Sequence, residues 1–137
     1  MVKDIVQHHD TFDFTPLFQE AKEKYIGIDC NDTLAFLSGG NEIHSFIGSA
    51  GGKDRLRKAI EEAISTDEAA DVIHDAASAM LTVVYSPQAE KPLTVVETQY
   101  ISEFVRQLPG DCSFFWNAST DISLGNEVRV VAFFDLR

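Results

Sequence analysis

Hydrophobic and polar residues follow two different periods along this chain, and each period predicts a different kind of element. Residues 42–50 alternate as a strand, with Ile43 and Phe46 on opposite faces, before a Gly51-Gly52 break. Apolar residues then recur at helical spacing from residue 56 to residue 64, with charged residues between them, which predicts the clearest helix of the chain. Residues 66–76 are acidic and rich in alanine, so either a short helix or an irregular turn fits them.

The second half of the chain repeats this order of strand and helix. Residues 79–85 are almost continuously apolar, which is typical of a central strand covered on both faces. Thr94 and Glu97 form a capping box that opens a second amphipathic helix, with Val96 in its apolar stripe, ended by Pro109-Gly110. Two β-branched and aromatic runs within Cys112–Phe134 flank a polar turn and predict a closing antiparallel hairpin.

The expected order is therefore β-α-β-α-β-β, which predicts an α/β (α+β) two-layer sandwich. Its sheet would be four-stranded and mixed, covered by two main helices. Residues 1–41 precede this core as an N-terminal extension packed on the domain of residues 42–137. In that extension, residues 14–24 suit a short helix, and residues 25–30 and 33–37 suggest a hairpin.

The charge of the chain limits its partners. It has 137 residues, 11 basic against 22 acidic, and a formal net charge of −11. Nucleic-acid binding needs clustered cations, and an anionic membrane surface would repel such a chain, so a protein partner is expected. Cys30 and Cys112 lack a CxxC spacing and are expected to be reduced thiols. With no signal-peptide pattern and no long apolar run, a cytoplasmic location is expected.

Several motifs share their order and spacing with one family. They are Ile47–Arg55, a glycine-rich turn before a helix that starts with an acidic residue and Arg; Ala59–Ser65, which reads Ala-x-x-x-Ala-Ile-Ser; Leu93-Thr94; and Leu124–Val130, which reads Leu-Gly-Asn-Glu-Val-Arg-Val. Together they resemble the C-terminal domain of the FtsZ/tubulin family, represented by the bacterial division protein FtsZ. The resemblance covers residues 45–135 and implies the fold of that domain.

The resemblance also implies a function in filament assembly without catalysis. In FtsZ, an Asn and two Asp residues of a loop complete GTP hydrolysis on the neighbouring subunit. If Asp13 aligns with the first of these Asp residues, Thr11 and Pro16 replace the others, and neither supplies the missing group. Asp13 is thus a weak catalytic candidate, and an acid at a helix start is the preferred interpretation.

The chain also lacks a glycine-rich phosphate loop. We therefore expect a non-enzymatic module without a cofactor. If the chain is a piece of a longer FtsZ-like protein, the parent would be a GTPase.

The expected partner is a tubulin-like subunit or a second copy of this chain, giving a homo-oligomer. The candidate interaction residues are Phe115 and Phe133, on a sheet face that helices would leave uncovered and aromatic, and Asp121, Leu124 and Asn126 in the hairpin loop.

An alternative is a small oligomeric α/β enzyme or ligand sensor with a site between subunits. Recognition of an anionic substrate would need convergent arginines, and the interior candidates are Arg55, Arg57, Arg106 and Arg129. A metal site at His8-His9 with nearby aspartates is less favoured than a polar terminus, so no metal is expected. His44 and His74 are expected to be ordinary surface or strand residues.

Overall fold

The computed structural model describes residues 5–9, 42–91 and 93–136. Its strands are β1 (Ile5–Gln7), β2 (Ile43–Ala50), β3 (Ala76–Tyr85), β4 (Ser113–Thr120) and β5 (Val128–Leu136). Its helices are α3 (Arg55–Ile64), α4 (Asp67–His74) and α5 (Gln99–Val105), with a short 3-10 helix, η1 (Ile122–Leu124), between β4 and β5. The helix and hairpin predicted for residues 14–37 lie outside the described residues.

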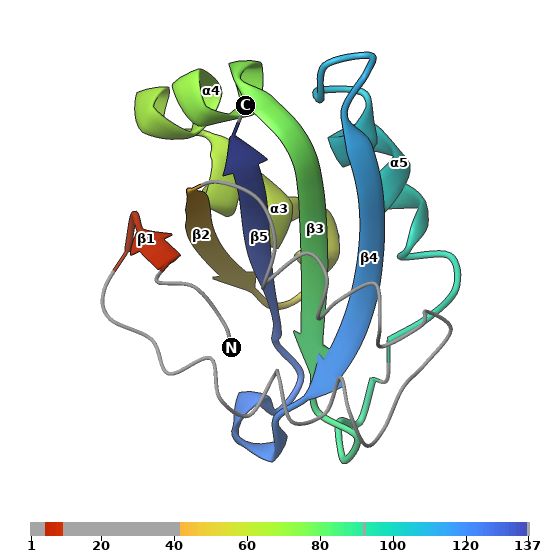
Figure 1. Ribbon diagram of the computed structural model, residues 1–137. Coiled ribbons are helices and arrows are strands. Elements are labelled where there is room, and N and C mark those ends of the chain that lie inside the picture. The colour runs from red at the N-terminus through yellow and green to blue at the C-terminus, as the bar shows by residue number, and fades with distance from the viewer. Residues whose placement is uncertain (1–4, 10–41, 92, 137) are drawn as a thin grey trace.

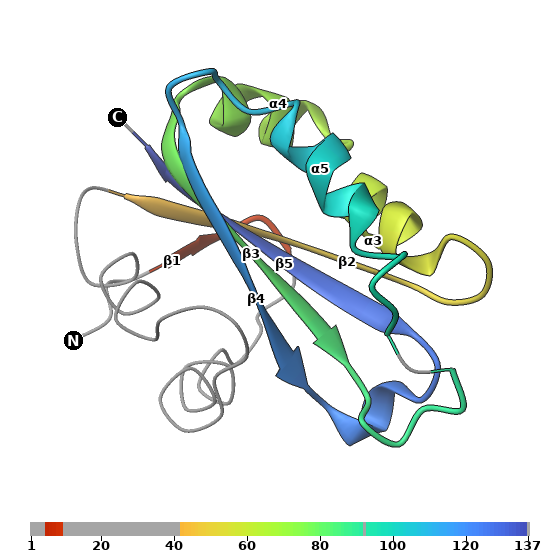
Figure 2. The same cartoon turned by 90° about the vertical axis from the view of Figure 1, so that its right-hand side faces the viewer.

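All five strands form one mixed sheet, and the three helices lie on one side of it (Figures 1 and 2). The predicted two-layer α/β architecture is confirmed. The strand order is β1-β2-β5-β3-β4, so the sheet has one more strand than predicted. The additional strand, β1, pairs parallel with β2 and has only three residues. Three residues are too few for a period of two to be recognised in the sequence.

The predicted closing hairpin is wrong. β4 and β5 are not neighbours, because β3 lies between them and pairs parallel with β4 and antiparallel with β5. Met80 of β3 is opposite Phe115 of β4 on one side and Phe133 of β5 on the other. The connection of residues 121–127 passes the end of β3, and its seven residues are ample to span two strand spacings of about 4.8 Å each.

The first predicted helix is confirmed as α3, which packs on β2 through its apolar stripe. Its buried apolar residues are Leu56, Ala59, Ile60, Ala63 and Ile64. The acidic stretch that followed it forms a helix, α4, instead of an irregular turn. Thr66 caps this helix, because its Oγ1 accepts a hydrogen bond from the backbone N of Ala69 at 3.1 Å.

The predicted capping box is also present, but the α-helix after it begins later than expected. The N of Glu97 donates to Thr94 Oγ1 at 3.2 Å, and the N of Thr94 donates to Glu97 Oε1 at 3.3 Å. Tight i to i+3 bonds follow, such as Gln99 N to Val96 O, so α5 starts only at Gln99. Val96, expected in the apolar stripe, is therefore 71% exposed, whereas Phe104 is buried as expected.

The sheet carries apolar side chains on both faces. Phe46, Phe104 and Phe134 belong to the core between sheet and helices. A second buried cluster occupies the opposite face, formed by Ile43, Met80, Val131 and Phe133. The predicted assignment of alternate β2 residues to opposite faces is thus confirmed.

Candidate interaction site at the loop end of the sheet

Three connections meet at one end of the sheet, which we call the loop end. They are residues 51–54 after β2, the described residues of 86–98 after β3, and residues 121–127 between β4 and β5. Because β2 and β3 are antiparallel to β5, and β4 is parallel to β3, the ends of these three strands and the start of β5 lie together (Figure 2).

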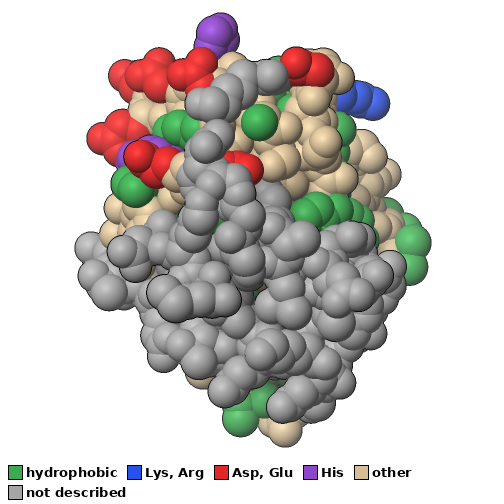
Figure 3. Space-filling model, in the orientation of Figure 1, with side chains coloured by type: hydrophobic (Ala, Val, Ile, Leu, Met, Phe, Trp, Pro, Cys, Tyr) green, Lys and Arg blue, Asp and Glu red, His purple; other side chains and the backbone are tan. Residues whose placement is uncertain are grey.

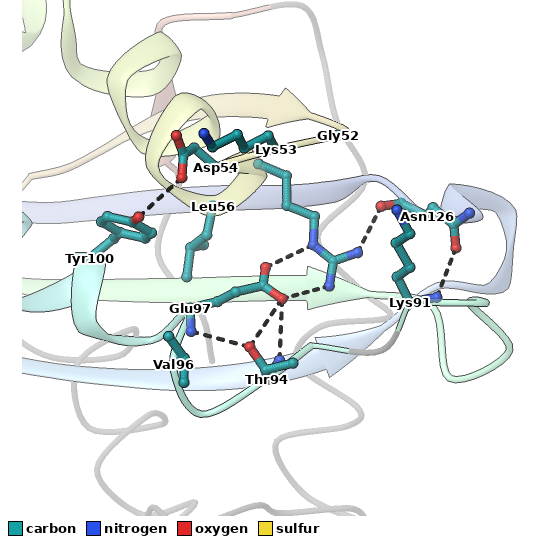
Figure 4. Close-up of a pocket in the computed structure, with 11 residues that line it drawn as sticks. Gly52, Lys53, Asp54, Leu56, Lys91, Thr94, Val96, Glu97, Tyr100 and Asn126 are labelled. Atoms are coloured by element: carbon teal, nitrogen blue, oxygen red, sulfur yellow. Dashed lines mark hydrogen bonds and ion pairs between the residues drawn. The ribbon is translucent and has the colours of Figure 1, made fainter.

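Arg55, the first residue of α3, joins these connections. Its side chain is buried, and its Nε and Nη2 donate to the two carboxylate oxygens of Glu97 at 2.7 and 2.8 Å. Its Nη1 donates to the backbone carbonyl of Asn126 at 2.8 Å (Figure 4). A bidentate pair of this kind fixes orientation as well as distance. One guanidinium therefore holds the loop between β4 and β5 and the turn before α5 against α3.

Arg55 and Glu97 each favour the charged form of the other. The hydrogen bond from Arg55 lowers the pKa of the Glu97 carboxyl, against the opposing effect of burial, and hydrogen bonds from Thr94 lower it further. The same hydrogen bond raises the pKa of Arg55 above its usual value. The pair is therefore ionised near neutral pH, with its charges matched inside the protein.

A cleft of about 760 Å³ opens beside this ion pair (Figure 4). It is lined by Gly52, Lys53, Asp54, Arg55, Leu56, Lys91, Thr94, Val96, Glu97, Tyr100 and Asn126. Of the four arginines considered for an anion site, Arg55 alone lines this cleft. Arg57 lies next to it, with its guanidinium 6.0 Å from the centre of the Tyr100 ring.

The three loop residues predicted to interact with a partner have different positions. Asn126 lines the cleft, and its Oδ1 accepts a hydrogen bond from the backbone N of Lys91 at 3.2 Å. Asp121 accepts hydrogen bonds from the hydroxyl and the backbone N of Ser123 at 2.7 and 2.9 Å, which lower the pKa of its carboxyl. Leu124, although part of the loop, is buried. Their role in contacting a partner stays a prediction.

The loop end also exposes apolar side chains that the sequence reasoning did not select. The exposed large hydrophobic residues of the described part of the chain are Val6, Val95, Val96, Val105 and Ile122. Three of these five are in loop-end connections, with Val95 at 88% and Ile122 at 66% exposed. An apolar residue inside a predicted polar turn, such as Ile122, was the signal available in the sequence.

The aromatic pair on the opposite sheet face differs from expectation. Phe133 is 1% exposed and Phe115 is half-buried, and both belong to the second apolar cluster, with Ile5 of β1 packed against it. The expected exposed aromatic face is therefore not seen at Phe133. Contact of these two residues with a partner remains a prediction.

A second polar cluster, also missed from the sequence, joins β2 to the residue after β1 and to α4. The Nε2 of His8 is 2.6 Å from the Nδ1 of His44. The outer nitrogens of the two rings contact carboxylates, His44 with Glu42 at 2.5 Å and His8 with Glu68 at 3.2 Å. The His8 ring also stacks on Phe46. Acidic and histidine side chains gather at this edge in Figure 3. These groups follow one another in a line, and no cluster suited to a metal ion occurs in the described residues.

Asp13, the weak catalytic candidate, and Cys30 lie outside the described residues.

Comparison with known proteins gives a result only at the level of structure. No family model and no curated protein matches the chain. An FtsZ dimer from M. jannaschii matches 82% of this chain with a TM-score of 0.66 and 22% sequence identity. CetZ from Methanosaeta thermophila matches 88% with a TM-score of 0.56 and 20% identity. TubZ from Bacillus thuringiensis serovar israelensis, solved as GDP-form protofilaments, matches 82% with a TM-score of 0.55 and 17% identity.

The chain has a tubulin-like fold. It spans about a third of the length of these structures, with 32% of FtsZ, 34% of CetZ and 31% of TubZ covered. This coverage is consistent with the resemblance of residues 45–135 to one FtsZ domain, and it confirms that resemblance at the level of the fold. No helix in the described residues is long and apolar enough to cross a membrane.

Proposed function

We propose that this chain is a non-catalytic protein-interaction and assembly module, similar in role to the C-terminal domain of FtsZ. Its partner is a tubulin-like subunit or a second copy of itself. The observation that carries the proposal is the structural likeness to FtsZ, a TM-score of 0.66 over 82% of this chain but only 32% of FtsZ. Two of the similar structures are described as a dimer and as protofilaments, which favours self-association as a property of this fold.

The loop end is the surface we propose for the contact. It carries the exposed side chains of Val95, Val96 and Ile122, and exposed apolar area is typical of interfaces. The Arg55 guanidinium holds two of its loops in place before any partner binds. Such preorganisation lowers the entropy cost of association.

Sedimentation velocity of the full chain, alone and with a tubulin-like GTPase such as FtsZ, tests this surface. Ile122→Asp and Val95→Asp are expected to abolish any assembly seen for the wild type. Val105→Asp is the matched control, because it adds the same charge at an exposed valine of α5, away from the loop end. Circular dichroism checks that each variant is folded. Equal loss of assembly in all three variants would contradict the choice of surface.

We also propose that the chain alone does not act on GTP. Its sequence lacks a phosphate loop, and two of the three residues aligned with the catalytic loop of FtsZ are Thr11 and Pro16. Titration calorimetry with GTP and magnesium is expected to give no binding heat. A saturable isotherm would overturn this part of the proposal.

A further inference from the structure

The guanidinium of Arg55 has more donors than the protein uses. An arginine side chain carries five N–H groups. Three of them donate to Glu97 and to the carbonyl of Asn126, which leaves one N–H on Nη1 and one on Nη2 without a partner in the described structure. The residue as a whole is only 6% exposed. Because Arg55 lines the cleft, a ligand there could come within reach of these donors and pair with them.

Two further cations stand at the same cleft. Lys53 and Lys91 both line it, and their ammonium groups make no hydrogen bond or ion pair with the described residues. The lining contains three basic residues against two acidic ones, Asp54 and Glu97, in a chain whose net charge is −11. Both acids already accept hydrogen bonds. The Tyr100 hydroxyl donates to Asp54 at 3.1 Å, and Arg55 donates to Glu97. The excess charge at this cleft is therefore positive.

The walls of the cleft suit a small organic ligand. Leu56, Val96 and the ring of Tyr100 supply apolar surface, and the volume of about 760 Å³ lies within the usual range for small-molecule sites. Figure 4 shows Lys53 beside Asp54 and Lys91 beside Asn126. A ligand could thus place an anionic group near the cations and its body against the apolar wall.

We propose that this cleft binds a small organic molecule through an oxyanion group, a phosphate or a carboxylate, held by the spare donors of Arg55 and by the ammonium groups of Lys53 and Lys91. Arginine donors match the geometry of such groups, and lysine supplies point charge. This binding goes beyond the assembly role and does not depend on it. It places a ligand next to Asn126 and Val96, so occupancy would alter the loop end.

NMR titration of the full 137-residue chain with inorganic phosphate, phenyl phosphate and benzoate tests the site, with sodium chloride at matched ionic strength as the salt control. We expect saturable shifts of the amide signals of Lys53, Arg55, Lys91 and Asn126, and tighter binding of phenyl phosphate than of inorganic phosphate. Lys53→Gln and Lys91→Gln should each weaken binding about tenfold, as for the loss of one charge-assisted hydrogen bond. Lys58→Gln, on the exposed face of α3, is the matched control and should bind as the wild type does.

Three results would overturn the proposal. They are the absence of saturable shifts with all three probes, shifts reproduced by chloride, and unchanged binding in the double variant Lys53→Gln/Lys91→Gln. If the double variant binds every probe as the wild type does but no longer assembles, the lysines serve an acidic group of a protein partner instead. Failure of the ligand site leaves the sedimentation result of Ile122→Asp unaffected, so the two proposals are tested separately.

Discussion

Arg55 and Glu97 are 42 residues apart in the sequence and are joined by two hydrogen bonds of 2.7 and 2.8 Å. Arg55 begins α3, and Glu97 is the last member of the capping box before α5. One carboxylate therefore caps a turn and neutralises a buried guanidinium. This double role links the packing of two helices to the shape of the cleft.

Glu97→Gln is expected to lower the free energy of unfolding by about 2–3 kcal/mol, because it leaves the buried Arg55 charge without its counter-ion. Glu61→Gln is the control, since it removes the same charge from a solvent-exposed pair with Arg57, 3.8 Å apart. Exposed pairs contribute about 0–1 kcal/mol. Urea unfolding of the two variants measures the difference. Equal effects would show that the Arg55–Glu97 pair adds no more than a surface pair.

The same pair predicts a dependence of stability on pH. Because the pKa of Glu97 is lower in the folded state than in the unfolded chain, the pair stabilises the protein above the unfolded value of about 4.3. That stabilisation is lost as pH falls through the folded pKa. The difference in unfolding free energy between wild type and Glu97→Gln should thus be largest near neutral pH and shrink under acid conditions. A difference that stays constant down to about pH 3 would contradict this linkage.

Gly48 of β2 is expected to be the least replaceable of the described glycines. A Cβ at this position would lie 2.1 Å from the carbonyl oxygen of Ala59 and 2.7 Å from the N of Ala63, both in the backbone of α3. Gly48→Ala must therefore push α3 away from β2, at a cost of about 3 kcal/mol or more. Gly110→Ala is the control, because nothing lies within 4 Å of its added Cβ. Thermal unfolding should separate the two variants, and similar melting temperatures would contradict the close approach.

The hydrogen bond between His8 and His44 predicts how β1 is held at the sheet edge. One ring must donate and the other must accept, so replacing either residue removes the bond. His44→Ala is expected to speed deuterium exchange of the His8 amide, which donates to Ser45 O at 3.0 Å, about tenfold. His74→Ala is the control, since that side chain is 88% exposed and its ring contacts Asp75. Unchanged exchange in His44→Ala would show that the bond between His8 and His44 does not hold β1 at the sheet edge.

Local patterns in the sequence were sufficient to predict the elements that bury one apolar face on the core. The alternation of residues 42–50 and the helical spacing of residues 56–64 gave β2 and α3, because each element has one face on the core. Thr94 and Glu97 were recognised in the sequence as the capping box that precedes α5.

Strand pairing was not accessible in this way. Residues 113–134 have the same apolar pattern whether β4 and β5 pair with each other or each pairs with β3. The prediction therefore placed the two strands, which are consecutive in the sequence, side by side in the sheet. In the same way, no local signal shows that Glu97 will meet Arg55 or that His8 will meet His44, because both contacts depend on the completed sheet.

Sedimentation velocity of the wild-type chain over a wide range of protein concentration, alone and with a tubulin-like GTPase such as FtsZ, tests the central claim most directly. The account predicts that the chain forms larger species with itself or with that GTPase, and that Ile122→Asp reduces them to the monomer while Val105→Asp does not. A chain that stays monomeric at every concentration and does not co-sediment with the GTPase would contradict the claim that this tubulin-like fold acts as an assembly module.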